Sequence, residues 1–162
     1  MYIIRGLGNL PPRFRGSAIT IGNFDGVHLG HQAVFHALCL RARALAAHAM
    51  AITFEPHPVR LLHPERAPPR ITGVRGKARW MEAYGVDAML ILRFTRELAS
   101  LPAETFVSRV LVEQLAVRDV LVGYDFRFGA GGRGDFAGLC ELGRHHGFQV
   151  ARQEALQLAD GV

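Results

Sequence analysis

Short apolar segments rich in β-branched residues alternate with longer segments of helical periodicity along most of this 162-residue chain. The apolar segments predict buried strands at residues 17–22, 50–54, 87–92, 118–123 and 148–152. The longer segments predict helices at residues 28–47, 74–84, 100–115 and 136–146. This alternation predicts an α/β fold with a doubly wound, mostly parallel sheet. The chain length fits one domain, and neither an internal repeat nor a linker divides it.

Two loops interrupt the alternation. Residues 55–70, EPHPVRLLHPERAPPR, contain several prolines, so we predict no regular secondary structure there. Residues 123–135, GYDFRFGAGGRGD, form a glycine-rich loop that we interpret as a flexible segment covering a ligand. Gly129, Gly131 and Gly134 satisfy the GxGxxG spacing, but a dinucleotide fingerprint follows its strand directly. The match is therefore weak.

The turn between the strand at 17–22 and the next helix, IGNFDGVHLGHQ at residues 21–32, carries the strongest functional signal. In parallel α/β sheets, ligands bind beyond the carboxyl ends of the strands. A helix N-terminus there offers unpaired backbone N–H groups and partial positive charge to a phosphate. Gly22, Gly26 and Gly30 allow the backbone to approach a ligand closely. The turn therefore predicts a site for a phosphate group.

Two histidines lie three residues apart in this turn. Because residues at i and i+3 of a helix are neighbours, the imidazoles of His28 and His31 are predicted to point the same way. Both rings can donate hydrogen bonds to one phosphate group. A zinc site is the alternative, but two further ligands are not apparent nearby, and helical zinc pairs more often occur as HExxH. We therefore interpret the pair as phosphate-binding.

The net charge of +5 is compatible with nucleic acid, a membrane surface or small anionic ligands. The basic residues are scattered, with Lys77 the single lysine, and form no long run. This pattern argues against a nucleic-acid binder and favours small polyanionic ligands. No apolar run approaches the roughly 20 residues of a membrane span, and no secretion signal is apparent. We expect a soluble cytoplasmic protein in which Cys39 and Cys140 are buried without a disulfide.

The segment GNFDGVHLGHQ (22–32) resembles the HxGH signature of the nucleotidylyltransferase superfamily. Its particular form is similar to the FMN adenylyltransferase module of prokaryotic FAD synthetase, which is often fused to a riboflavin kinase domain. Residues 52–58, 85–111 and 122–135 agree with the same module in the same order, so the resemblance spans nearly the whole chain. It implies a Rossmann-like nucleotidylyltransferase fold and the reaction ATP + FMN → FAD + pyrophosphate. It also implies Mg²⁺ held on the phosphates, with no side chain assigned as its ligand.

The resemblance implies a role for each matching residue. His28 and His31 would bind the ATP phosphates and stabilise the charge that develops during transfer. The other residues implied on the ATP side are Gly22, Asn23, Phe24, Asp25, Gly30, Asp125 and Arg127. Those implied on the flavin side are Phe54, Pro56, His57 and Pro58. Three alternatives remain open. Asp25 could only shape the turn without binding ATP, and residues 54–58 could form a plain structural loop. Phe126 and Phe128 could lie under the adenine, although we prefer a place for them in the core.

The chain departs from the family pattern at its end. The family's second signature, Ile-Ser-Ser-Thr-x-Ile-Arg, is expected shortly after residues 148–152, and the sequence stops where it should begin. We therefore expect residues 1–162 to be an FMN adenylyltransferase domain that lacks this signature and the kinase domain, with weak nucleotide binding and slow or no turnover. Two other hypotheses are a non-catalytic flavin- or nucleotide-binding fragment and a related cytidylyl- or adenylyltransferase for another phosphorylated small molecule. The expected partners are ATP and FMN alone, and the sequence gives no oligomeric state.

Overall fold

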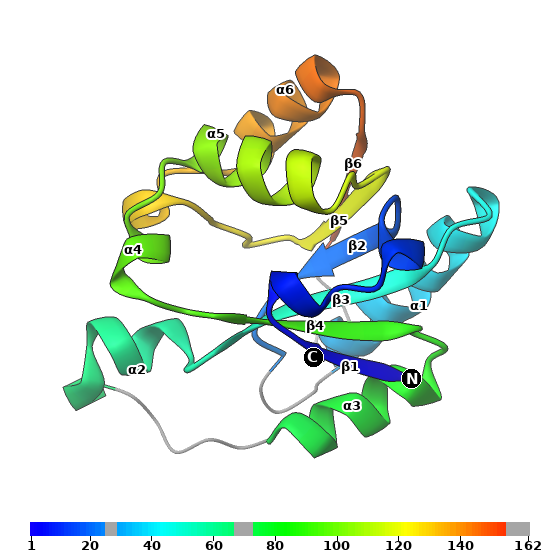
Figure 1. Cartoon of the computed structure of the whole chain (residues 1–162), viewed down its shortest axis with the longest axis horizontal. Coiled ribbons are helices and arrows are strands. Elements are labelled where there is room, and N and C mark those ends of the chain that lie inside the picture. Colours follow the sequence, from blue (N-terminus) through cyan, green and yellow to red (C-terminus); the bar gives the residue numbers. More distant parts are fainter. Residues whose placement is uncertain (25–28, 67–72, 155–162) are drawn as a thin grey trace, which may run out of the picture.

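The computed structural model describes residues 1–24, 29–66 and 73–154 and contains one six-stranded sheet (Figure 1). The strands are β1 (Tyr2–Arg5), β2 (Ala18–Ile21), β3 (Ala49–Glu55), β4 (Ala88–Arg93), β5 (Asp119–Gly123) and β6 (Gln149–Gln153). They lie in the order β1-β4-β3-β2-β5-β6, and every neighbouring pair is parallel. The predicted α/β class is confirmed, and the sheet is parallel throughout.

Helices cover both faces of this sheet (Figure 1). On one face lie α5 (Ala103–Phe106), which continues as a π-helical segment at Val107–Gln114, and α6 (Phe136–His146). On the other face lie α1 (Leu29–Ala44) and α3 (Val74–Ala83). The short helices α2 (Pro58–Leu62) and α4 (Arg96–Ala99) follow β3 and β4 directly. Within the described ranges, no helix combines the length and apolar character needed to span a bilayer.

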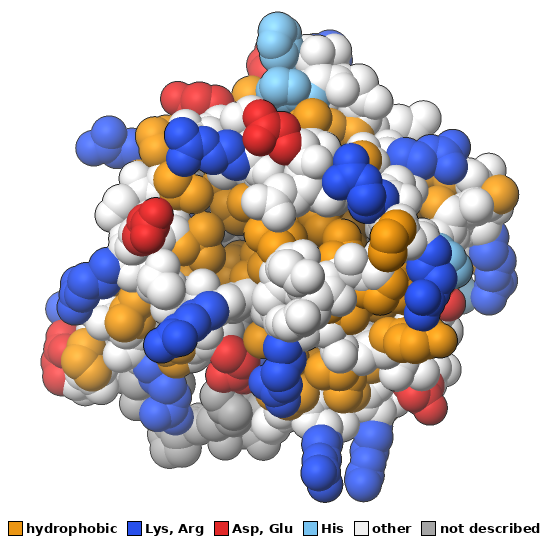
Figure 2. Space-filling model, in the orientation of Figure 1, with side chains coloured by type: hydrophobic (Ala, Val, Ile, Leu, Met, Phe, Trp, Pro, Cys, Tyr) orange, Lys and Arg blue, Asp and Glu red, His pale blue; other side chains and the backbone are white. Residues whose placement is uncertain are grey.

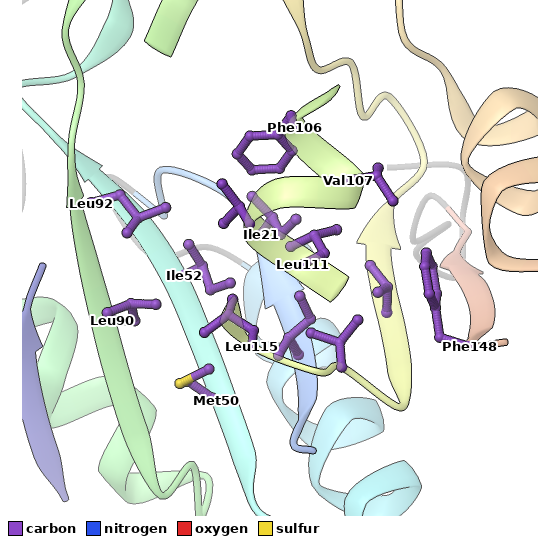
Figure 3. Packing of buried hydrophobic residues seen from close by; sticks show 14 of the residues in the cluster. Ile21, Met50, Ile52, Leu90, Leu92, Phe106, Val107, Leu111, Leu115 and Phe148 are labelled. Carbon is purple, nitrogen blue, oxygen red and sulfur yellow. The ribbon is translucent and has the colours of Figure 1, made fainter. Parts of the chain in front are cut away.

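The core consists of two clusters separated by the sheet. Along β3, Met50 and Ile52 pack under α5 and α6, whereas Ala49 and Ala51 pack under α1 and α3. This alternation follows from the period of two in a strand. Figure 3 shows the first cluster, in which Leu111 of the π-helical segment lies among side chains from the strands. Because both faces are covered, the inner strands read as continuous apolar runs in the sequence.

Two elements differ from the sequence-based expectations. Residues 55–70, predicted to lack regular structure, contain α2 and a 3₁₀ turn at Pro64–Arg66. The prediction was wrong because Pro58 occupies the first helical position, where proline's missing N–H costs no hydrogen bond. The edge strand β1 was not predicted at all. It has four residues, of which only Ile4 is buried, so its hydrophobic signal is short and weak.

The ends of α6 match the predicted range of 136–146. The Asp135 side chain accepts a hydrogen bond from the Gly138 N–H at 2.9 Å and caps the helix. Gly147 ends it in the left-handed region, at φ 85°. His145 and His146 lie in the last turn, where positive charge interacts favourably with the helix dipole.

The two cysteines differ in their surroundings, which gives a chemical test of the packing. Cys39 is buried and its Sγ donates a hydrogen bond to the Tyr84 carbonyl at 3.1 Å, whereas Cys140 is only half-buried. Burial, assisted by the nearby Asp87 carboxylate, raises the pKa of the Cys39 thiol. We expect iodoacetamide at mildly alkaline pH to modify Cys140 well before Cys39, because the thiolate is the reactive form. Peptide mass spectrometry measures both rates, and equal rates in the folded protein would contradict the packing.

Candidate functional site

A pocket of about 820 Å³ opens beyond the carboxyl ends of the central strands. The chain leaves β2 toward β3 on one side, while β5 pairs with β2 on the other. The loops that follow β2 and β5 therefore diverge and leave a crevice, as expected at a switch point of strand order. The described residues that line it come from the end of β2 and the turn after it, the first turns of α1, and β3 with α2. Others come from the segment after β4 with α4, the end of α5, the loop after β5 and the end of β6.

Phe24 connects the turn after β2 to the core under α1. Its backbone is in the left-handed region, at φ 53°. Its ring meets the His31 ring edge-on, with 5.3 Å between centroids, and packs against Phe35 at 5.1 Å. A Cβ atom on Gly22 would lie 2.8 Å from the Phe24 ring, so glycine leaves the space that this ring fills. Phe24 thus supports the His31 ring at the pocket wall.

Most of the residues predicted on the ATP side meet at this pocket. Those that line it are Gly22, Asn23, Phe24, Gly30, His31, Asp125 and Arg127. Asp125 and Arg127 are exposed, on the loop that follows β5. Asp25 and His28 lie outside the described residues, so the pairing of His28 with His31 stays a prediction.

The flavin-side residues lie on the other part of the same pocket. Phe54, at the end of β3, lines it together with His57 and Pro58. Pro56 is not among the described residues that line it. The Phe54 ring meets Phe94 edge-on, with 5.7 Å between centroids.

Phe94 and the α4 residue Leu98 also line the pocket, and sequence reasoning missed both. A signal existed, because Phe94 lies two residues beyond the predicted strand 87–92, whose carboxyl end had to reach the same edge of the sheet. The loop residue Tyr124 was missed as well, and its side chain is 58% exposed at the pocket. The pocket therefore carries more aromatic surface than the motifs indicated.

Phe126 and Phe128 belong to both the core and the pocket. Their rings stack with centroids 5.3 Å apart, pack against the cluster under α5 and α6, and line the pocket. The loop that carries them has defined backbone contacts, although the sequence suggested a flexible segment. Phe128 and Gly134 exchange hydrogen bonds of 3.1 and 2.8 Å, and the Ala130 N–H donates to the Leu101 carbonyl at 2.7 Å.

The charges around the site are mixed. The pocket is lined by one arginine and three histidines, which are Arg127, His31, His57 and His63. Two acidic residues, Asp125 and Glu154, also line it. In the part of the chain that the structure describes, no group of three or more His, Cys, Asp or Glu side chains is placed to hold a metal ion. In the orientation of Figure 1, Figure 2 shows Lys and Arg side chains spread among hydrophobic ones over the visible face of the molecule, in agreement with the scattered basic residues of the sequence. A parallel α/β sheet with this pocket at its switch point defines a doubly wound α/β protein, a class that binds ligands in this crevice.

The chain belongs to the FAD synthetase family, whose model matches residues 10–162. It is 44% identical to a bifunctional riboflavin kinase/FMN adenylyltransferase of Escherichia coli K12 over 93% of this chain and 48% of that protein. It is also 44% identical to the protein of the same name from Pseudomonas fluorescens, over 100% of this chain and 51% of that protein. The chain thus spans about half the length of these curated relatives. The resemblance found in the sequence motifs is confirmed.

Two solved structures share the fold. A macrolide-efflux protein from Streptococcus pneumoniae has a TM-score of 0.82 at 22% identity, over 99% of this chain and 52% of that one. A pantoate-beta-alanine ligase from Francisella tularensis, complexed with beta-gamma ATP and beta-alanine, has a TM-score of 0.59 at 11% identity, over 100% of this chain and 70% of that one. At these identities the likeness concerns the fold alone.

Proposed function

We propose that this chain is an FMN adenylyltransferase domain, which transfers the adenylyl group of ATP to FMN and forms FAD and pyrophosphate. One observation carries the proposal: most of the residues implied for ATP and most of those implied for the flavin line a single pocket of about 820 Å³. Two substrates must lie side by side to react, and one pocket that holds both supplies that proximity. Family membership and the names of the relatives support the same reaction.

In the proposed reaction, a phosphate oxygen of FMN attacks the α-phosphorus of ATP. A new oxygen–phosphorus bond forms there, the bond to the bridging oxygen of the β-phosphate breaks, and its electron pair leaves with pyrophosphate. Such transfers depend on positioning and charge stabilisation more than on covalent chemistry by the protein. His31, in the first turns of α1, would donate a hydrogen bond to the phosphates, and Arg127 would face them from the loop after β5.

Magnesium would act on the substrate. Mg²⁺ is often bound by substrate phosphates with few protein ligands, and the donor set of the described residues, without a cluster of three or more acidic or imidazole side chains, is compatible with that mode. Bound there, Mg²⁺ would neutralise part of the charge on the triphosphate. The protein would contribute hydrogen bonds and a shaped, partly apolar site.

The proposed activity can be tested by incubating the protein with MgATP and FMN and separating the flavins by chromatography. We expect FAD and pyrophosphate in equal amounts. Riboflavin in place of FMN should give no dinucleotide, because it lacks the attacking phosphate. Dinucleotide formation from riboflavin would contradict the proposed reaction.

Two other outcomes of this experiment distinguish the remaining hypotheses. Binding of FMN or ATP without any FAD, measured by flavin fluorescence and calorimetry, would identify a non-catalytic ligand-binding fragment. Pyrophosphate release with another phosphorylated acceptor, and none with FMN, would identify a related nucleotidylyltransferase.

A further inference from the structure

Tyr84, the C-cap residue of α3, contacts α1 at three points. Its hydroxyl donates a hydrogen bond to Gln32 Oε1 at 2.8 Å, and its ring packs against the Phe35 ring with 6.3 Å between centroids. Its backbone carbonyl accepts a hydrogen bond from Cys39 Sγ at 3.1 Å. The three partners are spaced by three and then four residues along α1, so they share one face of that helix. One residue of α3 therefore holds about two turns of α1.

The backbone that carries Tyr84 is tied to the sheet. Directly after Tyr84, the Val86 N–H donates a hydrogen bond to the Met81 carbonyl at 3.0 Å, and the Asp87 N–H donates to the Ala49 carbonyl at 2.9 Å. Ala49 is the first residue of β3, which lies in the interior of the sheet. Met81 and Val86 are both buried in the cluster under α1 and α3. The Tyr84 side chain thus extends from a fixed platform.

Gln32, which accepts the hydrogen bond from the Tyr84 hydroxyl, lies at the start of α1 and directly follows His31. The N–H groups of the first turn of a helix have no intrahelical acceptor, so contacts with the rest of the protein must hold that turn. The Phe24 ring lies 5.3 Å from the His31 ring and 5.1 Å from the Phe35 ring, between centroids. Tyr84 therefore reaches His31 by two routes, through Gln32 and through the Phe35 and Phe24 rings.

We propose that Tyr84 is a positioning residue for nucleotide binding: its hydrogen bond to Gln32 fixes the first turn of α1, and with it His31, at the pocket. This inference rests on the phosphate-binding role proposed for His31. A helix N-terminus binds phosphate through groups whose directions the first turn sets, and small errors in such positions are costly in transfer reactions. Tyr84 is not among the described residues that line the pocket, so it acts through α1 and does not touch the substrate.

The other end of the same contact provides a matched control. Cys39 also bonds to Tyr84, but it lies seven residues beyond Gln32 along α1 and is not among the described residues that line the pocket. Tyr84→Phe keeps the ring and removes only the hydroxyl, whereas Cys39→Ala removes the thiol. Both variants should have a lower melting temperature, because each loses one hydrogen bond between the two helices. Only Tyr84→Phe should loosen the start of α1.

Backbone hydrogen exchange, followed by NMR in the ligand-free protein, measures this loosening. The N–H groups of residues 33–36 bond back to the first turn of α1, so their exchange reports how often that turn opens. Loss of one hydrogen bond should raise their exchange rates about 2–10-fold in Tyr84→Phe, relative to the rest of α1. In Cys39→Ala these rates should keep their wild-type ratio to the rest of the helix. A uniform change along α1 in Tyr84→Phe would overturn the proposal.

Ligand binding supplies the second measurement. Tyr84→Phe should weaken MgATP binding, measured by calorimetry without FMN, about 2–10-fold, while FMN binding, measured by flavin fluorescence, stays near wild type. Gln32→Leu should reproduce this effect, and the double variant should bind MgATP no more weakly than either single variant, because both changes remove the same bond. Cys39→Ala should bind both ligands as wild type does.

Two results would contradict this positioning role. An equal loss of MgATP and FMN binding in Tyr84→Phe would show that the hydroxyl only stabilises the fold. Additive losses in the double variant would show that Tyr84 does not act through Gln32. Absence of MgATP binding in wild type would instead refute the phosphate-binding role of His31, while the exchange rates would still decide whether Tyr84 fixes the first turn of α1.

Discussion

Replacing His31 with alanine is expected to lower the rate of FAD formation about 10²–10³-fold, the loss typical of removing one donor that stabilises transition-state charge. His31 lines the pocket in the first turns of α1, beside the turn that follows β2. In phosphoryl-type transfer, negative charge develops on the transferred group and on the leaving pyrophosphate, and a positioned imidazole stabilises it. Alanine cannot supply that hydrogen bond. It is also a good helix former, so α1 should persist.

A control on the same helix separates catalysis from folding. His36 is exposed, five residues further along α1. His36→Ala should keep wild-type turnover and wild-type stability. We would compare initial rates of FAD formation at saturating MgATP and FMN, together with the melting temperatures of the three proteins. Unchanged turnover in His31→Ala would remove His31 from the proposed mechanism, and loss of the folded state would assign it a structural role.

The sequence predicted the inner part of the fold well because the central strands are buried on both faces. Such strands appear as continuous apolar runs, and the predicted segments 17–22, 50–54, 87–92 and 118–123 all correspond to strands of the sheet. The edge strand β1 lacks this signal. It forms because it pairs with β4, and its own composition does not identify it as a strand. Helix α2 was hidden by prolines, although one of them occupies a position that favours a helix start.

The sequence predicted only those parts of the candidate site that lie in a recognisable motif directly after a predicted strand. Carboxyl ends of parallel strands meet at one edge, so the turn after β2 and the loop after β5 could be expected to converge. Contacts made across the pocket could not be expected in this way. Phe94 meets Phe54 because β3 and β4 are neighbours, and the role of Gly22 as space for the Phe24 ring depends on side-chain packing. Spacing in the chain carries no information on such partners.

The Arg41–Asp119 ion pair carries the largest expected effect on stability. Asp119, the first residue of β5, is 1% exposed, and Arg41 reaches it from α1 with Nε–Oδ1 and Nη2–Oδ2 distances of 3.0 and 2.8 Å. Arg41→Leu should cost about 3–5 kcal/mol of unfolding free energy, because it leaves a buried carboxylate without its partner. We expect the lower end of this range, since the Arg41 side chain is 32% exposed and water can reach part of the pair.

Urea unfolding measures this cost, and two further variants identify its cause. Arg43→Leu removes an exposed arginine two residues away on α1 and should change the unfolding free energy by less than about 0.5 kcal/mol. Arg41→Leu combined with Asp119→Asn should recover most of the loss, because the uncompensated charge is then gone. If the double variant is no more stable than Arg41→Leu, the cost comes from lost packing of the arginine stem instead. Because Asp119 lies at the amino end of β5, opposite the pocket, turnover per folded molecule should stay near wild type in all three variants.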